Sequence, residues 1–220
     1  MKYAWIKIVL VNSNAHQSKL ITANAPEEVD YEALGFKNVV GIDNTGAWRD
    51  ADGLGRHLKA KGAAKVLLTA PGKGDLKNIV FGVNEDQINS DDTIISAASC
   101  TTNAITPTLK VLHEKYGVEN GHVETVHSYT NDQNLIDNFH KADRRGRAAA
   151  LNMVITSTGA ASAVAKAYPA LGGKLTGNAI RVPTPNVSLA ILNLTLKADV
   201  NVEELNGFLN ETAQSAAFQK

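Results

Sequence analysis

The sequence predicts an α/β fold, because short β-rich runs alternate with amphipathic helical segments through the first half of its 220 residues. The run Val39–Asp43 ends in the turn residues Asn44–Gly46. A helical segment, Asp50–Lys61, follows, and Gly62 ends it before the next β-rich run, Lys65–Ala70. Strands that alternate with helices over this distance form a largely parallel sheet covered by helices.

The composition excludes several other classes of protein. The chain is 44% apolar and 20% charged, with 22 basic residues balancing 22 acidic ones, which argues against disorder and coiled coils. Apolar runs such as Ile8–Val11 fall far short of the roughly 20 residues that span a bilayer. Met1 opens no signal segment. Because the chain is formally neutral, it has no net electrostatic field that would attract nucleic acid or anionic lipid. We therefore expect a cytoplasmic chain that binds neither nucleic acid nor membrane.

Two further β-rich runs, Ile79–Val83 and Thr93–Ala97, complete the predicted sheet, and the pattern changes near Ser99. We place a domain boundary there, which gives a first domain over residues 1–99 and a second over residues 100–220.

The second half begins with a predicted helix over Thr101–Tyr116, in which Pro107 lies within the first two turns and is tolerable. A strand at His122–Tyr129 leads into Thr130–Arg147, a polar stretch that predicts a long loop, and long ordered loops are usually functional. The remaining predicted elements are a helix over Thr158–Tyr168, a half-buried strand at Leu192–Leu196 and a last helix that starts at a capping box on Asn201 and Glu204.

Cys100 is the single cysteine and forms no internal disulfide. It precedes a predicted helix, so the helix dipole favours its thiolate, a nucleophile for carbonyl carbon. A buried, inert cysteine fits the spacing about equally well. His127 lies 27 residues further on and could return from a neighbouring strand to take the thiol proton, whereas we interpret the other five histidines as structural.

Phosphate-sized sites are predicted at two places. Ser157–Gly159 precedes an Ala-rich helix, and Thr101 stands at the start of the cysteine helix, where backbone N–H groups favour anions. Arg181 could contribute a guanidinium group, and Thr130 a hydroxyl, to the binding of a phosphate. Simple helix capping is about twice as probable for each hydroxyl taken alone.

No motif specifies a cofactor or a metal. The G-x-G runs at Gly53 and Gly72 lack the third glycine of the dinucleotide fingerprint, and we interpret both as turns. One cysteine and scattered histidines give no metal-ligand spacing, so we expect no metal site.

The run Ser96–Asn103, Ser-Ala-Ala-Ser-Cys-Thr-Thr-Asn, resembles the catalytic segment of phosphorylating glyceraldehyde-3-phosphate dehydrogenases, enzymes of glycolysis. Four further segments resemble that family in its order and close to its spacing. They are Thr125–Thr130, Ser157–Ala161, Lys174–Gly177 and Arg181–Val187.

The resemblance implies that Cys100 attacks an aldehyde, that His127 acts as base, and that inorganic phosphate cleaves the resulting thioester. Thr130 and Arg181 match residues that hold the substrate phosphate. The remaining matches are Ser99, Thr101, Thr158 and Gly159 around the attacking phosphate, and Asn44, Thr45, Gly46 and Thr69 beside NAD or NADP.

The resemblance also implies an architecture, extending from about Ile21 to the end of the chain. Residues 1–99 correspond to the C-terminal part of a Rossmann-like NAD(P)-binding domain, and residues 100–220 to a catalytic domain incomplete at its C-terminus. The family's first βαβ unit has no counterpart, which suggests a fragment. Family members are homotetramers in which the arginine-rich loop lines a neighbouring subunit's cofactor site.

Two alternatives remain open. Asn131–Asn134 and Asp143–Arg145 resemble a bacterial branch close to erythrose-4-phosphate dehydrogenase, which would oxidise erythrose 4-phosphate to a free acid. The chain could also be a truncated, non-catalytic homologue with a subunit-interface role, and its basic loop could simply be solvated.

Overall fold

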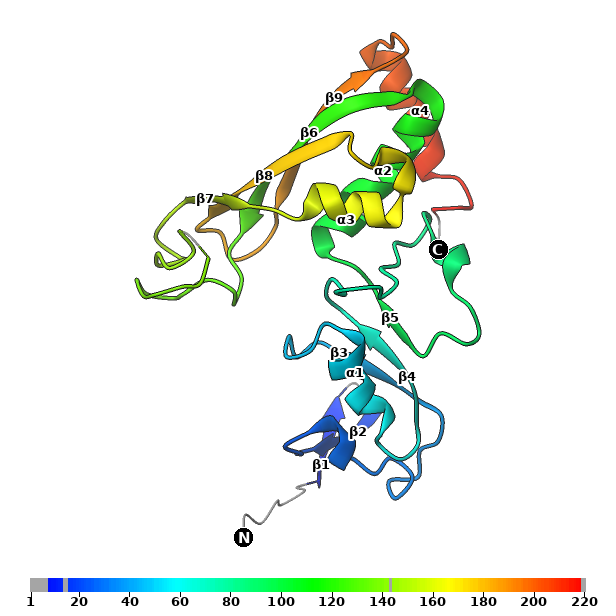
Figure 1. Cartoon of the computed structure of the whole chain (residues 1–220), viewed down its shortest axis with the longest axis vertical. Helices are drawn as coiled ribbons and strands as arrows, with labels where there is room; N and C mark the ends of the chain where they lie inside the picture. Colours follow the sequence, from blue (N-terminus) through cyan, green and yellow to red (C-terminus); the bar gives the residue numbers. More distant parts are fainter. Residues whose placement is uncertain (1–7, 14–15, 143, 219–220) are drawn as a thin grey trace. The chain divides into compact units, whose positions relative to one another are not determined.

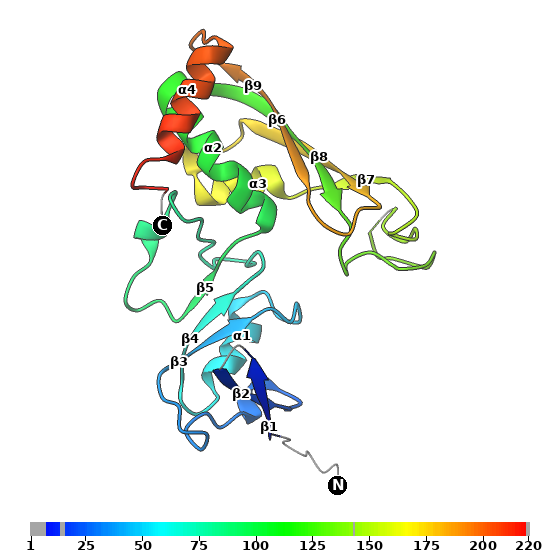
Figure 2. The same ribbon diagram turned by 180° about the vertical axis from the view of Figure 1, so that it is seen from behind.

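The computed structural model describes residues 8–13, 16–142 and 144–218, which form two compact units (Figures 1 and 2). Of these described residues, those up to Ile79 and those in 86–98 form the N-terminal unit, and those in 80–85 and from Ser99 onward form the C-terminal unit. Among the described residues, no helix has the length and apolar character needed to cross a bilayer.

The N-terminal unit contains a parallel three-stranded sheet of order β3-β4-β5, which confirms the α/β prediction for this segment. Asp50 caps its helix by accepting the Gly53 N–H, and Leu54 on that helix is buried against Val66 and Leu68 of the central strand. The elements are β1 (Ile8–Ser13) and β2 (His16–Ile21), an antiparallel hairpin, then β3 (Val39–Asp43), α1 (Ala51–Leu58), β4 (Ala63–Leu68) and β5 (Ile94–Ser96), with short 3₁₀ turns at Pro26–Glu28 and Glu85–Gln87.

The prediction of a strand at Ile79–Val83 is wrong, because these residues belong to no strand. After an isolated bridge between Asn78 and Ser96, the chain turns instead of continuing a ladder. The side chain of Asn84 accepts the Val80 N–H at 2.8 Å, and Gly82 adopts a φ of +76°, a value outside the β region. The apolar run therefore forms a tight turn.

The C-terminal unit is a mixed four-stranded sheet of order β7-β8-β6-β9, with the helices α2 and α3 packed on one face. The central strand β6 pairs in parallel with β8 and antiparallel with β9, and β7 pairs antiparallel with β8. The elements are α2 (Cys100–Tyr116), β6 (Val118–Ser128), β7 (Val154–Ser157), α3 (Ala160–Ala167), a 3₁₀ turn (Pro169–Leu171), β8 (Leu175–Val182), β9 (Leu189–Leu196) and α4 (Val202–Ala213).

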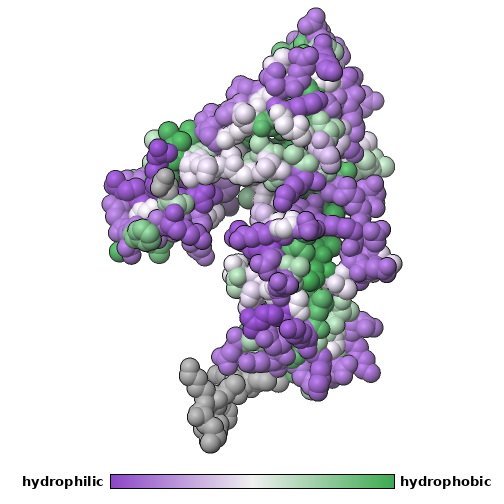
Figure 3. Space-filling view, in the orientation of Figure 1, coloured by the Kyte–Doolittle hydropathy of each residue, from purple (hydrophilic) through white to green (hydrophobic). Residues whose placement is uncertain are grey.

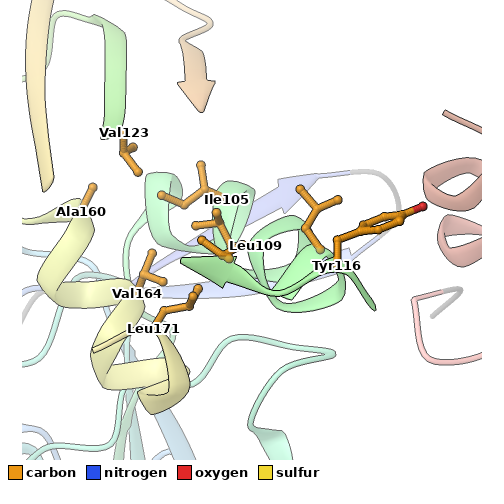
Figure 4. Packing of buried hydrophobic residues seen from close by; sticks show 9 residues of the cluster. Ile105, Leu109, Tyr116, Val123, Ala160, Val164 and Leu171 are labelled. Carbon is orange, nitrogen blue, oxygen red and sulfur yellow. The ribbon is translucent and has the colours of Figure 1, made fainter. Parts of the chain in front are cut away.

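The core of this unit lies between α2, α3 and β6, as Figure 4 shows. Leu109 from α2 and Val164 from α3 are fully buried, and both belong to one apolar cluster with Val123 from β6. Burying a side chain of this size stabilises the fold by roughly 1.5–3 kcal/mol. The cluster fixes α2, and with it Cys100, on the sheet.

Several boundaries match the sequence-based predictions. The predicted cysteine helix is confirmed as α2, and the Asn201 cap is confirmed because its side chain accepts the Glu204 N–H. The described residues of the predicted loop, 130–142 and 144–147, contain no helix or strand. Strand β6 begins four residues earlier than expected, at Val118. The strands β1, β2, β7 and β8 were not predicted.

His113 links the end of α2 to β6, and its environment predicts a loss of stability in acid. Its Nδ1 accepts the Val118 N–H at 3.0 Å, while burial and then the nearby charge of Lys174 hold the imidazole pKa below its usual value. The folded state therefore takes up a proton less readily than the unfolded state, so stability present above about pH 6.5 is lost as the pH falls through the folded pKa.

We expect His113→Gln to remove this titration. Urea unfolding at several values between pH 7.5 and pH 5 measures it: the unfolding midpoint of the variant should fall less steeply with acidification than that of the wild type. Parallel curves for the two proteins would show that His113 does not carry the effect.

Candidate active site

Cys100 is the first residue of α2 and is exposed. Ser99 caps the helix, since its Oγ accepts the Thr102 N–H at 3.0 Å. Within the described part of the chain, the N–H groups of Cys100 and Thr101 have no hydrogen-bond partner. The sulfur therefore lies at the positive end of a 17-residue helix beside free donors.

The Cys100 Sγ lies 3.7 Å from the His127 Nε2, which brings the predicted nucleophile and base into contact. His127 Nδ1 is 2.7 Å from the Ser128 carbonyl oxygen, which can only accept, and 3.3 Å from the Arg181 Nη1, which can only donate. Because the contact with the carbonyl oxygen is much the shorter, we assign a proton to Nδ1. Nε2 of the neutral ring then presents its lone pair to the sulfur. This tautomer suits a base that removes the thiol proton.

Arg181 joins the pair through the sheet, because the register of β6 and β8 places it opposite His127. Its Nη1 lies 3.1 Å from the Ser128 carbonyl and 3.3 Å from the Thr130 Oγ1. Its Nε is buried and has no partner among the described residues. Burial, and then the charge of Arg145, hold the pKa of Arg181 below the ordinary arginine value. A half-buried cation with spare donors is suited to an anion.

Arg145 is a second cation near Arg181 that the sequence analysis did not single out. It forms an ion pair with Asp132, and its Nε donates to the Thr156 Oγ1 at 3.1 Å. Burial alone would raise the pKa of Asp132, but the hydrogen bond and charge of Arg145 outweigh it and lower that pKa. The available signal was a basic run in a long loop. Asp143, in the same loop, lies outside the described residues.

The predicted ligands of the attacking phosphate lie at the starts of α2 and α3. Thr158 Oγ1 accepts the Ala160 N–H at 3.2 Å, and Gly159 is the N-cap of α3. Thr101 Oγ1 lies 4.0 Å from the Cys100 Sγ. Among the residues that the structure describes, no hydrogen bond joins Thr158 or Gly159 to the Cys100–His127 pair.

The four predicted cofactor residues belong to the N-terminal unit. Asn44, Thr45 and Gly46 follow the carboxyl end of β3, and Thr69 follows that of β4. In open parallel sheets, ligands bind at this edge. Gly46 has a φ of +75°, and a Cβ placed there would meet no atom within 4 Å, so the turn is open to a ligand. No group of three acidic, His or Cys side chains that could hold a metal occurs among the described residues.

Comparison with known proteins agrees with this geometry. Residues 99–220 match the family model "Glyceraldehyde 3-phosphate dehydrogenase, C-terminal domain". A glyceraldehyde-3-phosphate dehydrogenase-like protein of Pseudomonas aeruginosa (strain UCBPP-PA14) is 62% identical over 210 residues, 96% of this chain and 46% of that protein.

More distant relatives show the same partial coverage. The chloroplastic glyceraldehyde-3-phosphate dehydrogenase A of Zea mays is 49% identical over 89% of this chain and 48% of its own length. The glyceraldehyde-3-phosphate dehydrogenase of Clostridium pasteurianum is 44% identical over 92% of this chain and 60% of its own length. This chain thus spans about half the length of the curated relatives it matches. With a family model over more than half of its residues and a cysteine–histidine contact at the start of α2, the chain belongs to the glyceraldehyde-3-phosphate dehydrogenase family.

Proposed function

We propose that the protein oxidises glyceraldehyde 3-phosphate to an acyl phosphate, using NAD or NADP and inorganic phosphate, in the cytoplasm. The observation that carries the proposal is the 3.7 Å contact between the Cys100 Sγ and the His127 Nε2, with Arg181 opposite His127 in the sheet. Family membership supports the same reaction.

In this reaction His127 Nε2 takes the thiol proton, and the Cys100 Sγ forms a bond to the aldehyde carbon. The aldehyde oxygen gains negative charge, which the free N–H groups of Cys100 and Thr101 stabilise. The nicotinamide cofactor, when bound, supplies the acceptor for the hydride that converts the thiohemiacetal to a thioester. A phosphate oxygen then attacks the thioester carbon, the C–S bond breaks and the thiolate of Cys100 is restored.

Two anion sites serve this reaction. We assign the substrate phosphate to Arg181 and Thr130, because the buried Nε of Arg181 lacks a partner in the described chain. The attacking phosphate is assigned to the starts of α2 and α3, where helix N–H groups and the charge of Arg145 favour an anion. The residues concerned are Ser99, Thr101, Thr158 and Gly159.

We assign NAD or NADP to the turn Asn44–Gly46 and to Thr69. The open space beside Gly46 and the position at the carboxyl edge of the parallel sheet support this assignment. The N-terminal unit would then be the cofactor-binding part and the C-terminal unit the catalytic part.

We further propose that the working protein is a homotetramer. The segment between β6 and β7 exposes large apolar side chains, visible as green patches on the lobe at the left of Figure 3. Exposed apolar surface of this kind marks contacts between proteins. The side chains are Leu135, Ile136, Phe139, Leu151 and Met153.

The proposed reaction predicts phosphate-dependent turnover. With glyceraldehyde 3-phosphate and NAD or NADP, we expect absorbance at 340 nm to rise only when inorganic phosphate is present, because phosphate must release the acyl group from Cys100. The same assay with erythrose 4-phosphate is the comparison. Turnover that is faster with erythrose 4-phosphate and independent of phosphate would assign the chain to the alternative activity, and absence of any turnover would favour a non-catalytic role.

A second prediction concerns the thiol. His127→Asn should slow alkylation of Cys100 by iodoacetamide at pH 7, because Nε2 no longer removes the proton. Mass spectrometry of the modified peptide gives the rate. The matched control is His122→Asn, which changes a histidine on the same strand that bonds to Thr176 on the opposite face. Equal rates in the wild type and His127→Asn would contradict the pairing.

A third prediction concerns Arg181. Arg181→Ala should lower kcat/KM for glyceraldehyde 3-phosphate by the equivalent of about 1.5–3 kcal/mol, the usual loss for a charge-assisted hydrogen bond. For unphosphorylated glyceraldehyde the loss should be much smaller. Arg144→Ala removes an exposed arginine of the loop and is the control. Equal losses for both substrates would show that Arg181 is structural.

A further inference from the structure

Asp43, the last residue of β3, is a buried acidic residue of the N-terminal unit: the residue is 1% exposed and its side chain is fully buried. An unpaired carboxylate in such a position is costly, and buried charges are retained where several donors satisfy them. Asp43 also directly precedes the Asn44–Gly46 turn that we assign to the cofactor.

The hydrogen bonds of Asp43 reach two of the four residues assigned to the cofactor. Its Oδ1 accepts both the N–H and the Oγ1 of Thr45, each at 2.8 Å. Its main-chain oxygen accepts the Thr69 N–H at 3.0 Å and the Thr69 Oγ1 at 3.1 Å. A single residue therefore sets the position of the turn after β3 relative to the end of β4.

The second carboxylate oxygen of Asp43 is held by α1. His57 Nε2 lies 2.8 Å from Oδ2, and the His57 ring meets the Trp48 ring edge-on at 5.5 Å. Burial alone would raise the pKa of Asp43, but the hydrogen bonds from Thr45 and His57 outweigh it and lower that pKa. The group is therefore a carboxylate, and Nε2 of His57 donates to it.

Only a carboxylate can accept hydrogen bonds from Thr45 and from His57 at the same time in this geometry. An asparagine has one acceptor oxygen, which could serve the Thr45 turn or His57 but not both in the same geometry. Asp43 thus holds the start of the Asn44–Gly46 turn and, through His57, links that turn to α1.

We propose that Asp43 and His57 are positioning residues for the dinucleotide: together they hold the Asn44–Gly46 turn and Thr69 in the arrangement that receives it. The inference rests on the assignment of this turn to NAD or NADP. Neither residue needs to touch the cofactor, because the pair acts through Thr45 and Thr69.

The test replaces His57 by Phe, which keeps a ring against Trp48 but removes the Nε2 donor. Calorimetric titration of the full chain with NAD and NADP should show affinity reduced about tenfold, the factor expected for one lost charge-assisted hydrogen bond. His57→Gln, whose side-chain amide can donate to Asp43, should recover most of the affinity. Lys59→Ala, an exposed change at the end of the same helix, should leave it unaltered.

Amide hydrogen exchange gives a readout independent of cofactor binding. In His57→Phe the Thr45 and Thr69 amides should exchange about tenfold faster, because the Asp43 carboxylate loses one of its two anchors. The Val66 amide in the middle of β4 should exchange at the wild-type rate. If His57→Phe does not fold, Asp43→Asn serves as the second variant with the same expected changes.

The outcomes separate the two claims. Wild-type chain that binds neither NAD nor NADP would overturn the cofactor assignment and with it the role in positioning the dinucleotide. The exchange rates would then decide only whether Asp43 and His57 hold the Asn44–Gly46 turn. Unchanged affinity and unchanged Thr45 exchange in a folded His57→Phe variant would overturn the positioning role while leaving the cofactor assignment intact.

Discussion

The register of the parallel pairing between β6 and β8 is the constraint on which the catalytic site depends. It sets His127 opposite Arg181, and a slip of one residue would turn one of them to the other face of the sheet. Burial of Val123 and Ala179 on the helix-covered face fixes that register. Gly177 allows the strands to approach, because a Cβ there would lie 2.8 Å from the Val123 carbonyl oxygen.

The lengths of α2 and β6 bring Cys100 back to His127. The helix extends about 24 Å from Cys100 to its last residue, at 1.5 Å per residue. Gly117 then reverses the chain with a φ of +71°, and β6 covers about 30 Å before it reaches His127. A helix and the strand that follows it, joined by one residue, thus place two distant side chains in contact.

Much of the fold was predictable from the sequence, and the misses have physical reasons. The apolar periodicity of α1, α2 and β9 and the cap at Asn201 identified those elements. Strand β8 was missed because Gly177 and Asn178 interrupt its apolar alternation, and such residues are uncommon in strands. The Ile79–Val83 run was wrongly predicted as a strand because composition does not reveal the turn that Gly82 and Asn84 impose.

The candidate site was predictable to a different extent. Five ordered motifs identified Cys100 and His127 through a family resemblance, and the structure places them in contact. Arg145 was missed because its relevance lies in its positive charge near Arg181, whose pKa is lowered by burial and then by that charge. The two residues are far apart in the sequence. Asp43 and His57 had no signal at all, since a buried acid–imidazole pair is visible only when a strand end and a helix face are brought together.

Helix capping and anion binding at the start of α2 are two uses of one arrangement. The Ser99 hydroxyl satisfies the Thr102 N–H and thereby fixes the first turn of the helix. The N–H groups of Cys100 and Thr101 stay unpaired within the described chain and point from that fixed turn. The cap therefore prepares the donors that a developing oxyanion requires, without an additional residue dedicated to that purpose.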